Sequence, residues 1–369
     1  MINYEQRFIR KYILENQNQS TFDMVSTSTE IKEKIREKFA DEVGYAHTKT
    51  RMDAIMPRIL EKQGDLLKQK SIISEPCRTL ISPHDDYTHV GYIYPLGLQN
   101  IKAKTVILFG VFHRGRSLGC EDKLVFDSFT HWQGPYGKMK VSPLRDEIIA
   151  LLPKDYFEVN DDFQSQEWSV EAELPFLQYA NKDFEFISIL VSSMSFERMK
   201  EVAKSFADKL GQLMKEKALE WGKDVSILIS NDAVHYGDEG WGGQNFARYG
   251  ADEKGKKLAV EHDHEIIKTC LEGEITEQKV ELFMKYVNQE ENYRDTKWSW
   301  CGRMSVPFGL LTSLYLEQNL NVKKINGVLL GYSTSIDQES LPVSDLDGMG
   351  TTTAANLRHW VGYVSLAYI

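Results

Sequence analysis

Short apolar runs rich in β-branched residues recur along most of this 369-residue sequence. Five of them cover residues 78–84, 104–113, 184–193, 225–232 and 325–333. Continuous apolar runs of this length are typical of strands that are buried on both faces of a sheet. The sequence therefore predicts a sheet that lies inside the molecule, with another layer on each side.

Helical patterns separate these runs, at residues 142–153, 195–222, 253–273 and 276–289. Alternation of strand and helix favours a mostly parallel sheet covered by helices. We therefore expect an α/β fold with three layers, in which a mostly parallel central sheet is flanked by helices. Because no repeat or low-complexity linker interrupts the region, residues 76–369 are predicted to form one α/β domain.

The first 75 residues have a different composition. They are highly charged, and their apolar residues recur at mixed spacings of three and four, which indicates helices that pack on something larger. We expect residues 1–75 to be a helical N-terminal extension and not an independent domain.

The balance of charge limits the partners. The formal net charge is -10, from 54 acidic and 44 basic residues, whereas a nucleic-acid-binding protein needs clustered Lys and Arg to neutralise phosphates. An anionic membrane surface is disfavoured for the same reason. The N-terminus lacks the apolar core of a secretory signal, and no stretch approaches a membrane-spanning length. We expect a soluble, cytoplasmic protein without nucleic-acid or membrane partners, and nothing in the sequence fixes an oligomeric state.

Metal-competent side chains stand where three predicted strands end: His84, His113, and Asp232 with His235. In open α/β sheets, ligands bind beyond the carboxyl ends of the strands, where separate loops converge. Two histidines and one anionic ligand make a site for Fe, Zn or Cu that keeps open positions. Cys301 could supply the anionic ligand as a thiolate. Each of these residues alone also has a structural interpretation, as a hydrogen-bonded His or a small buried Cys.

The four cysteines, at positions 77, 120, 270 and 301, show no C-x-x-C spacing. Reduced thiols are therefore expected, and neither a disulfide framework nor a zinc finger is indicated. The segment 166–179 carries Glu167 and Glu171 four residues apart, with Ser169 as a possible helix cap. It is either an amphipathic helix with a solvated acidic face or a source of carboxylates that orient metal-ligating histidines.

Six blocks, taken together, resemble the Memo family, which includes AmmeMemoRadiSam system protein B. They are SPH (82–84), GVFHRG (110–115), GPYGKMKV (134–141), EWSVEAELPFLQ (167–178), SNDAVHYG (230–237) and CGRMSVPFGLL (301–311). The resemblance spans about residues 78–369. Their order makes the resemblance specific, although no single block is decisive.

The resemblance implies a fold similar to the class III extradiol dioxygenases, which are non-haem iron enzymes. It implies a divalent metal, with Fe(II) favoured and Cu or Zn possible, and a small-molecule substrate. The residues that it implies are His84, His113 and Cys301 as metal ligands, Asp232 and His235 as catalytic residues, and Tyr87, Glu167 and Trp168 at the substrate. A His near its unperturbed pKa suits acid or base work toward substrate.

The chain departs from the family pattern beside the expected ligands. Asp85 and Asp86 replace Ala-Gly after the first Pro-His, Val111 and Phe112 replace Pro-Asn, and Trp168 replaces a His. His89 is an additional candidate, with a surface position as the simpler interpretation.

The leading hypothesis is a Memo-like, Fe- or Cu-dependent oxidoreductase, dioxygenase-like in its chemistry. A non-catalytic binding or adaptor protein that holds a peptide or metabolite in the same pocket is an alternative. The resemblance to Memo implies phosphotyrosine segments as such a ligand, and their recognition requires Arg114, Arg116 or Arg303 in the pocket. Zinc-dependent hydrolysis with Asp232 or a glutamate as base is another. A Cys301–His nucleophile is a weaker one, because the sequence shows no oxyanion loop.

Overall fold

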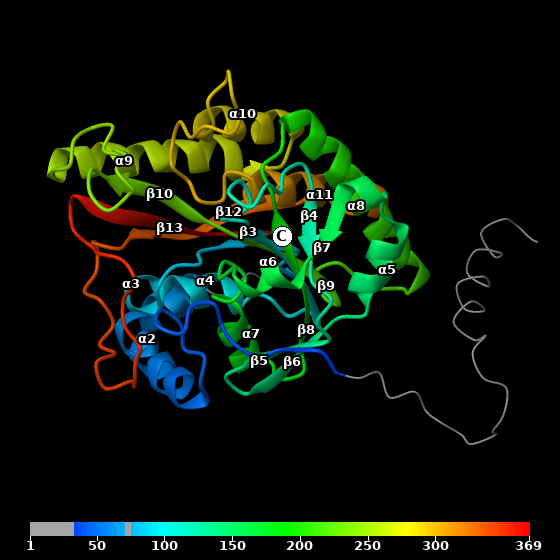
Figure 1. Cartoon of the computed structure of the whole chain (residues 1–369), viewed down its shortest axis with the longest axis horizontal. Coiled ribbons are helices and arrows are strands. Elements are labelled where there is room, and N and C mark those ends of the chain that lie inside the picture. The colour runs from blue at the N-terminus through cyan, green and yellow to red at the C-terminus, as the bar shows by residue number, and fades with distance from the viewer. Residues whose placement is uncertain (1–32, 71–74) are drawn as a thin grey trace, which may run out of the picture. The chain divides into compact units, whose positions relative to one another are not determined.

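The computed structural model describes residues 33–70 and 75–369, of which Lys34–Ile369 form one compact unit. A central sheet in this unit lies between two groups of helices (Figure 1). The main path of the sheet runs in the order β1 (Ile35–Arg36), β5 (His131–Gly134), β6 (Gly137–Val141), β8 (Glu185–Val191), β3 (Thr105–Val111), β9 (Val225–Ser230), β2 (Thr79–Ser82), β13 (His359–Tyr368), β12 (Asn326–Thr334) and β11 (Gly273–Glu274). Three strands lie off this path: β10 (Asp232–Gly237), β4 (Leu124–Phe126) and β7 (Phe157–Val159).

The centre of the sheet is parallel. Strands β6, β8, β3, β9 and β2 pair in parallel, whereas β13 pairs antiparallel with β2, β10 and β12. The predicted α/β architecture is confirmed, and its parallel part is this centre. All five apolar runs form strands. Four of these strands are buried on both faces along nearly their whole length, whereas β12 is partly exposed, with Val328 at the surface.

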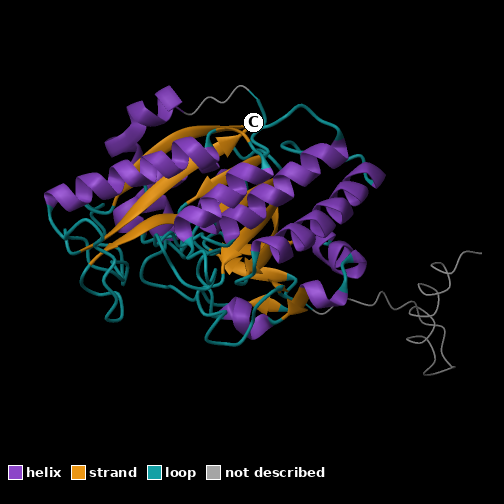
Figure 2. Ribbon diagram, turned by 90° about the horizontal axis from the view of Figure 1, so that it is seen from above, coloured by secondary structure: helices purple, strands orange, loops and turns teal. Residues whose placement is uncertain are grey.

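Helices cover both faces of the sheet, which gives three layers (Figure 2). One face carries α5 (Leu144–Leu151), α8 (Phe196–Glu216), α9 (Glu253–Ile266) with the π-helical turn Ile267–Leu271, α10 (Glu277–Val287) and α11 (Ser305–Leu320). The other carries α2 (Lys49–Lys70), α3 (Tyr87–Val90), α4 (Ile93–Leu98) and α7 (Leu174–Ala180). The short helices α6 (Asp161–Ser165) and Lys154–Tyr156 lie in connections near β7.

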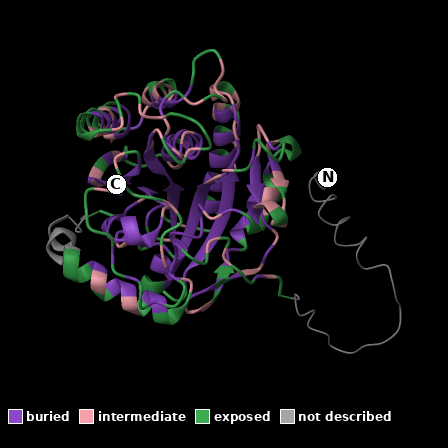
Figure 3. Cartoon of the chain, turned by 60° about the vertical axis from the view of Figure 1, so that its left-hand side comes forward, coloured by how far each residue is buried: buried purple, intermediate pink, exposed green. Residues whose placement is uncertain are grey.

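Each helical layer closes its own apolar core. Alternate residues of β3 point to opposite faces, so that Ile107 and Phe109 enter one core and Val106 and Leu108 the other. Figure 3 shows the central strands buried and the outer sides of the helices exposed. The sheet is therefore held rigidly, and the carboxyl ends of its parallel strands form a fixed edge.

The predicted N-terminal extension falls partly outside the described residues. Within the described part, α2 is helical, but β1 is a strand that pairs with β5. Lys34 and the residues after it belong to the same compact unit as the α/β region. In residues 33–70 and 75–369, every helix is too short or too polar to cross a lipid bilayer.

Candidate metal centre

The site lies where neighbouring parallel strands end. His84 follows β2, His113 follows β3, and Asp232 begins β10, separated from the end of β9 by Asn231 alone. Cys301 comes from the loop before α11 and is tied to this edge, because its backbone N–H donates to the Asp232 carbonyl (3.0 Å). Gly302 packs so closely on Asn231 that an added Cβ would lie 2.2 Å from Oδ1.

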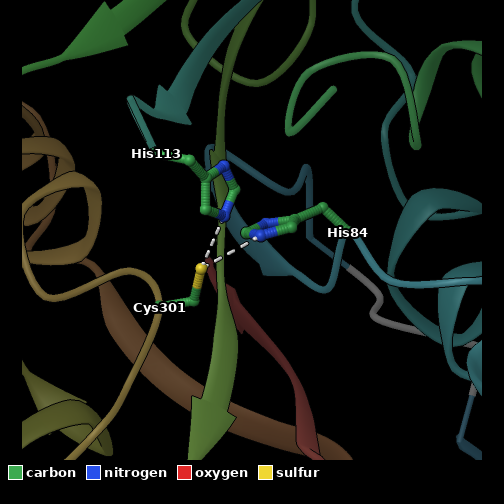
Figure 4. A group of neighbouring side chains, drawn as sticks. All are labelled: His84, His113 and Cys301. Carbon is green, nitrogen blue, oxygen red and sulfur yellow. Dashed lines mark hydrogen bonds between the residues drawn. The ribbon is translucent and has the colours of Figure 1, made fainter. Parts of the chain in front are cut away.

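His84, His113 and Cys301 converge on one point (Figure 4). The Cys301 Sγ lies 2.9 Å from His113 Nε2 and 3.3 Å from His84 Nε2. The three donor atoms all lie within 4.8 Å of one another. This is the spacing expected of side chains that share one ion.

Glu167 fixes the ring of His113. Its carboxylate accepts from His113 Nδ1 (2.8 Å) and from the backbone N–H groups of His113, Trp168 and Ser169. Because Nδ1 carries the proton, Nε2 is left to face the sulfur. Orientation of a ligating His by a carboxylate is common at metal centres. The Trp168 ring stacks on the imidazole, with 4.4 Å between centroids.

Ser230 fixes the ring of His84 in a similar way. Its hydroxyl donates to the Ser169 carbonyl, so its oxygen accepts from His84 Nδ1 (2.7 Å). The backbone N–H of His84 donates to Asp232 Oδ1 (2.9 Å). Both imidazoles therefore present Nε2 to Cys301, and each ring is held from behind.

The electrostatics of the cluster favour a thiolate. Burial raises the pKa of the Cys301 thiol, but the imidazoles of His113 and His84 outweigh it and hold this pKa well below its usual value. Burial likewise opposes protonation of His113, yet Cys301 and Glu167 raise its pKa well above the ordinary range. The sulfur of Cys301 is therefore negatively charged, and the protons of the two imidazoles balance this charge. A bound metal cation would balance it in place of those protons.

Asp232 and His235 adjoin the triad. Asp232 Oδ2 lies 3.3 Å from His84 Nε2 and 3.9 Å from His235 Nε2. Asp232, His235 and Cys301 form a second group with donor atoms within 4.8 Å. Burial lowers the pKa of His235, but Asp232 and Cys301 raise it to about 10. Its Nε2 is buried without a hydrogen-bond partner among the described residues.

A cavity of about 390 Å³ opens beside these side chains. It contains His84, His113, Asp232 and His235 in its wall. The rest of the lining is Ala40, Asp41, Tyr45, Asp85, Asp86, Trp168, Trp241, Thr352, Thr353 and Val361. Its volume is in the range of small-molecule sites.

The family model for Memo-like proteins matches residues 43–347. The chain belongs to the Memo family. A MEMO1 family protein of Pyrococcus abyssi is 26% identical over 274 residues, which cover 70% of this chain and 80% of the relative. One from Pyrococcus furiosus is 26% identical over 278 residues, 69% and 85% of the two chains. One from Thermotoga neapolitana is 28% identical over 166 residues, 43% of this chain and about half (54%) of the relative.

The family match extends further toward the N-terminus than the resemblance seen in the sequence, which begins at about residue 78. It leaves part of the cavity wall outside the matched residues, namely Ala40, Asp41, Thr352, Thr353 and Val361. Asp85 and Asp86, which directly follow His84, both line the cavity.

The three residues predicted at the substrate lie in different places. Trp168 lines the cavity. Glu167 is buried behind His113, and Tyr87 is buried in the core, where its hydroxyl donates to the Ala172 carbonyl. Neither belongs to the described cavity lining. A substrate contact by Glu167 or Tyr87 stays a prediction.

The interpretation of residues 166–179 as a helix with a solvated acidic face is wrong. Glu167, Glu171 and Glu173 are all buried. The helix, α7, begins only at Leu174, and the Ser169 hydroxyl donates to the Val111 carbonyl instead of capping it. The second interpretation, a carboxylate that orients a histidine, describes Glu167.

His89 is also not at the surface. It is buried in α3, where its ring nitrogens lie 3.5 Å from Thr353 O and Ser340 Oγ. It belongs to neither of the two metal-competent groups found among the described residues.

Several functional residues gave no signal in the sequence. Ser230 and Ser169 lie inside recognised blocks, but small hydroxyl residues are common there. Tyr45, Trp241 and Thr352 reach the cavity from irregular segments outside the strands and helices, and no local pattern predicts such an approach.

Proposed function

We propose that this Memo protein is a metal-dependent enzyme that acts on a small organic molecule in the cavity. His84, His113 and Cys301 would hold one divalent ion, with Fe(II) favoured and Cu or Zn also compatible with such ligands. The observation that carries the proposal is the convergence of three donor atoms from separate segments within 4.8 Å. A dioxygenase-like oxidoreductase is the reaction class that we favour.

The donor set fits an ion of this kind. In each imidazole, Nδ1 donates to a protein acceptor, so Nε2 is available to bind an ion. The lowered pKa of Cys301 makes its sulfur an anionic ligand. When bound, Fe(II) supplies redox chemistry and Lewis acidity at positions that three protein ligands leave open.

The side chains around the triad would serve the substrate. His235 lies in the wall of the cavity, and its Nε2 has no hydrogen-bond partner among the described residues. The nearest carboxylate oxygen, Asp232 Oδ2, is 3.9 Å away. With its pKa raised to about 10, His235 carries a proton at neutral pH, so this pair suits donation of a proton to a bound molecule. Trp168 and Trp241 offer flat apolar surfaces that would orient the molecule and exclude water.

The charge of the cavity disfavours the phosphotyrosine adaptor. Among the described residues, its lining contains four Asp and no Lys or Arg. The three arginines that an adaptor needs bind elsewhere: Arg114 donates to Gln166, Arg116 to Arg294 and Asp295, and Arg303 to Asn288, Tyr293 and Arg294. Zinc-dependent hydrolysis differs from the favoured reaction by the identity of the metal.

The test is elemental analysis of protein purified without oxygen. We expect about one equivalent of transition metal per chain, lost in the double variant His84→Ala/His113→Ala. His131→Ala/His264→Ala is the matched control, because it removes two histidines that line no part of the cavity. Retention of the full metal content by the His84/His113 variant would reject the proposal, and zinc alone after metal-controlled expression would favour hydrolysis.

A further inference from the structure

Asp263 is a buried carboxylate that contacts the segments preceding Cys301 and His235. It lies on α9, its side chain is fully buried, and it has no ion pair with any residue in the described ranges. Oδ1 accepts from the indole N–H groups of Trp298 (2.8 Å) and Trp300 (2.6 Å). Oδ2 accepts from the Tyr332 hydroxyl (2.7 Å) and the backbone N–H of Val234 (3.3 Å). Four donors on one buried carboxylate leave it little freedom to move.

Two of these donors adjoin the residues of the site. Trp300 directly precedes Cys301, and Val234 directly precedes His235. Their segments also pair with each other, because Val234 and Trp300 form an antiparallel bridge and the His235 N–H donates to the Ser299 carbonyl (3.0 Å). Figure 1 shows α9 running beside β10.

Asp263 also completes a β-bulge. Asp232 pairs with Tyr363 and His235 with Val361, so β10 has one residue more than β13 between these pairs. A bulge takes backbone groups out of the ladder and redirects side chains, often next to active sites. Here the Val234 N–H turns to Asp263 Oδ2.

We propose that Asp263 is a positioning residue, which holds the β10 bulge and the segment Trp298–Trp300 together so that Cys301 and His235 face the same centre. The proposal deepens the proposed function and rests on it for the role of the ion. It assigns Asp263 no contact with metal or substrate.

The test uses matched indole substitutions. Trp300→Phe and Trp298→Phe each remove one N–H from Asp263 Oδ1 and keep an aromatic ring, but only Trp300 adjoins Cys301. In Asp263→Asn, an NH₂ group replaces one carboxylate oxygen. It faces two N–H or O–H donors and cannot accept from them, so these two hydrogen bonds are lost. The probe is Co²⁺ alone, read by its thiolate charge-transfer band and by its affinity.

We expect Trp300→Phe and Asp263→Asn to bind Co²⁺ about tenfold or more weakly, the usual effect of losing an outer-shell contact, with a shifted band. Trp298→Phe should stay close to wild type. If Asp263→Asn does not fold, the Trp pair decides alone. Equal effects of the two Trp variants, or a wild-type band and affinity in folded Trp300→Phe, would overturn the positioning role.

Crystal structures of metal-free wild type and Trp300→Phe separate this inference from the proposed function. We expect Sγ of Cys301 to move away from His113 Nε2 in the variant, and an unmoved sulfur counts against the inference. If wild type takes up no Co²⁺ at all, the proposed function fails, while the position of the sulfur still decides the role of Asp263.

Discussion

Glu167 and His113 are joined twice: the imidazole Nδ1 donates to Oε1 at 2.8 Å, and the backbone N–H of His113 donates to Oε2 at 2.9 Å. The carboxylate therefore fixes both the rotation of the ring and the path of the chain that carries it. A ligand held at two points loses little conformational entropy when it binds an ion, which favours tight and selective binding.

The first prediction concerns Glu167→Gln. The amide can satisfy Nδ1 only by turning its NH₂ toward the backbone donor, so one of the two contacts is lost. We expect metal affinity to fall by about 10- to 100-fold, measured by competition with a fluorescent chelator. Glu197→Gln, the same change at an exposed position on α8, should leave affinity unchanged. Wild-type affinity in Glu167→Gln would show that the carboxylate serves folding alone.

The second prediction concerns the four thiols. The pKa of Cys301 is held well below its usual value by His113 and His84 against the effect of burial. Burial raises the pKa of Cys77 to about 12, of Cys120 to about 11 and of Cys270 to about 12. Because the thiolate is the nucleophile, iodoacetamide near neutral pH should modify Cys301 first in metal-free protein, as read by peptide mass spectrometry.

Bound metal should protect Cys301 from this reaction, and Cys301→Ser should leave the protein almost unmodified. Faster labelling of Cys77, Cys120 or Cys270 would contradict the arrangement of charges around the sulfur.

The two histidines of the triad could be predicted because they stand just after strands. The buried runs before His84 and His113 predict parallel strands, and parallel strands deliver their following residues to one edge. Cys301 has no such local signal, and its assignment came from the Memo resemblance. The structure brings all three together.

Other features could not be predicted, for physical reasons. The spacing of Glu167 and Glu171 fits a solvated helix as well as two buried carboxylates. Each buried carboxylate needs a partner, and the partners, His113 and Arg36, are distant in sequence, so no local pattern reveals them. Helix α11 was not predicted because it is buried almost all round, between α8 and the sheet, and so lacks a polar face. The donors to Asp263 come from three separate segments, which no local pattern relates.

The third prediction is a pH dependence of stability. Burial raises the pKa of Glu171 to about 7, although Arg36 and the backbone N–H groups of Ala40 and Asp41 act in the opposite direction. Since the unfolded value is about 4.3, the folded state binds this proton more tightly, and its contribution to stability grows as pH falls through 7 and levels off near 4.

Relative to Glu171→Gln, wild type should therefore gain about 2 kcal/mol in free energy of unfolding between about pH 8 and pH 5. Urea unfolding of both proteins at the two pH values measures this difference. The contributions of the other titrating groups are the same in both proteins and therefore cancel. A relative loss of stability at the lower pH would mean that Arg36 keeps Glu171 ionised throughout.

The fourth prediction follows from the negative charge of the cavity. Asp85 accepts from the Tyr363 hydroxyl (2.7 Å), and Asp86 accepts from the Thr352 backbone and hydroxyl, so both carboxylates are fixed in the wall. A phosphotyrosine peptide brings further negative charge to a lining without Lys or Arg, and like charges repel more strongly where water is excluded. We expect calorimetric titration of the protein with a phosphotyrosine peptide to show no saturable binding. Burial and the neighbouring Asp232 raise the pKa of Asp85, so the titration is run at alkaline pH, which favours the ionised carboxylate. Under these conditions Asp85→Asn keeps an acceptor for Tyr363 and removes negative charge, so any residual affinity should rise in this variant. Saturable binding by wild type that Asp85→Asn weakens would contradict the role given to these carboxylates and restore the adaptor hypothesis.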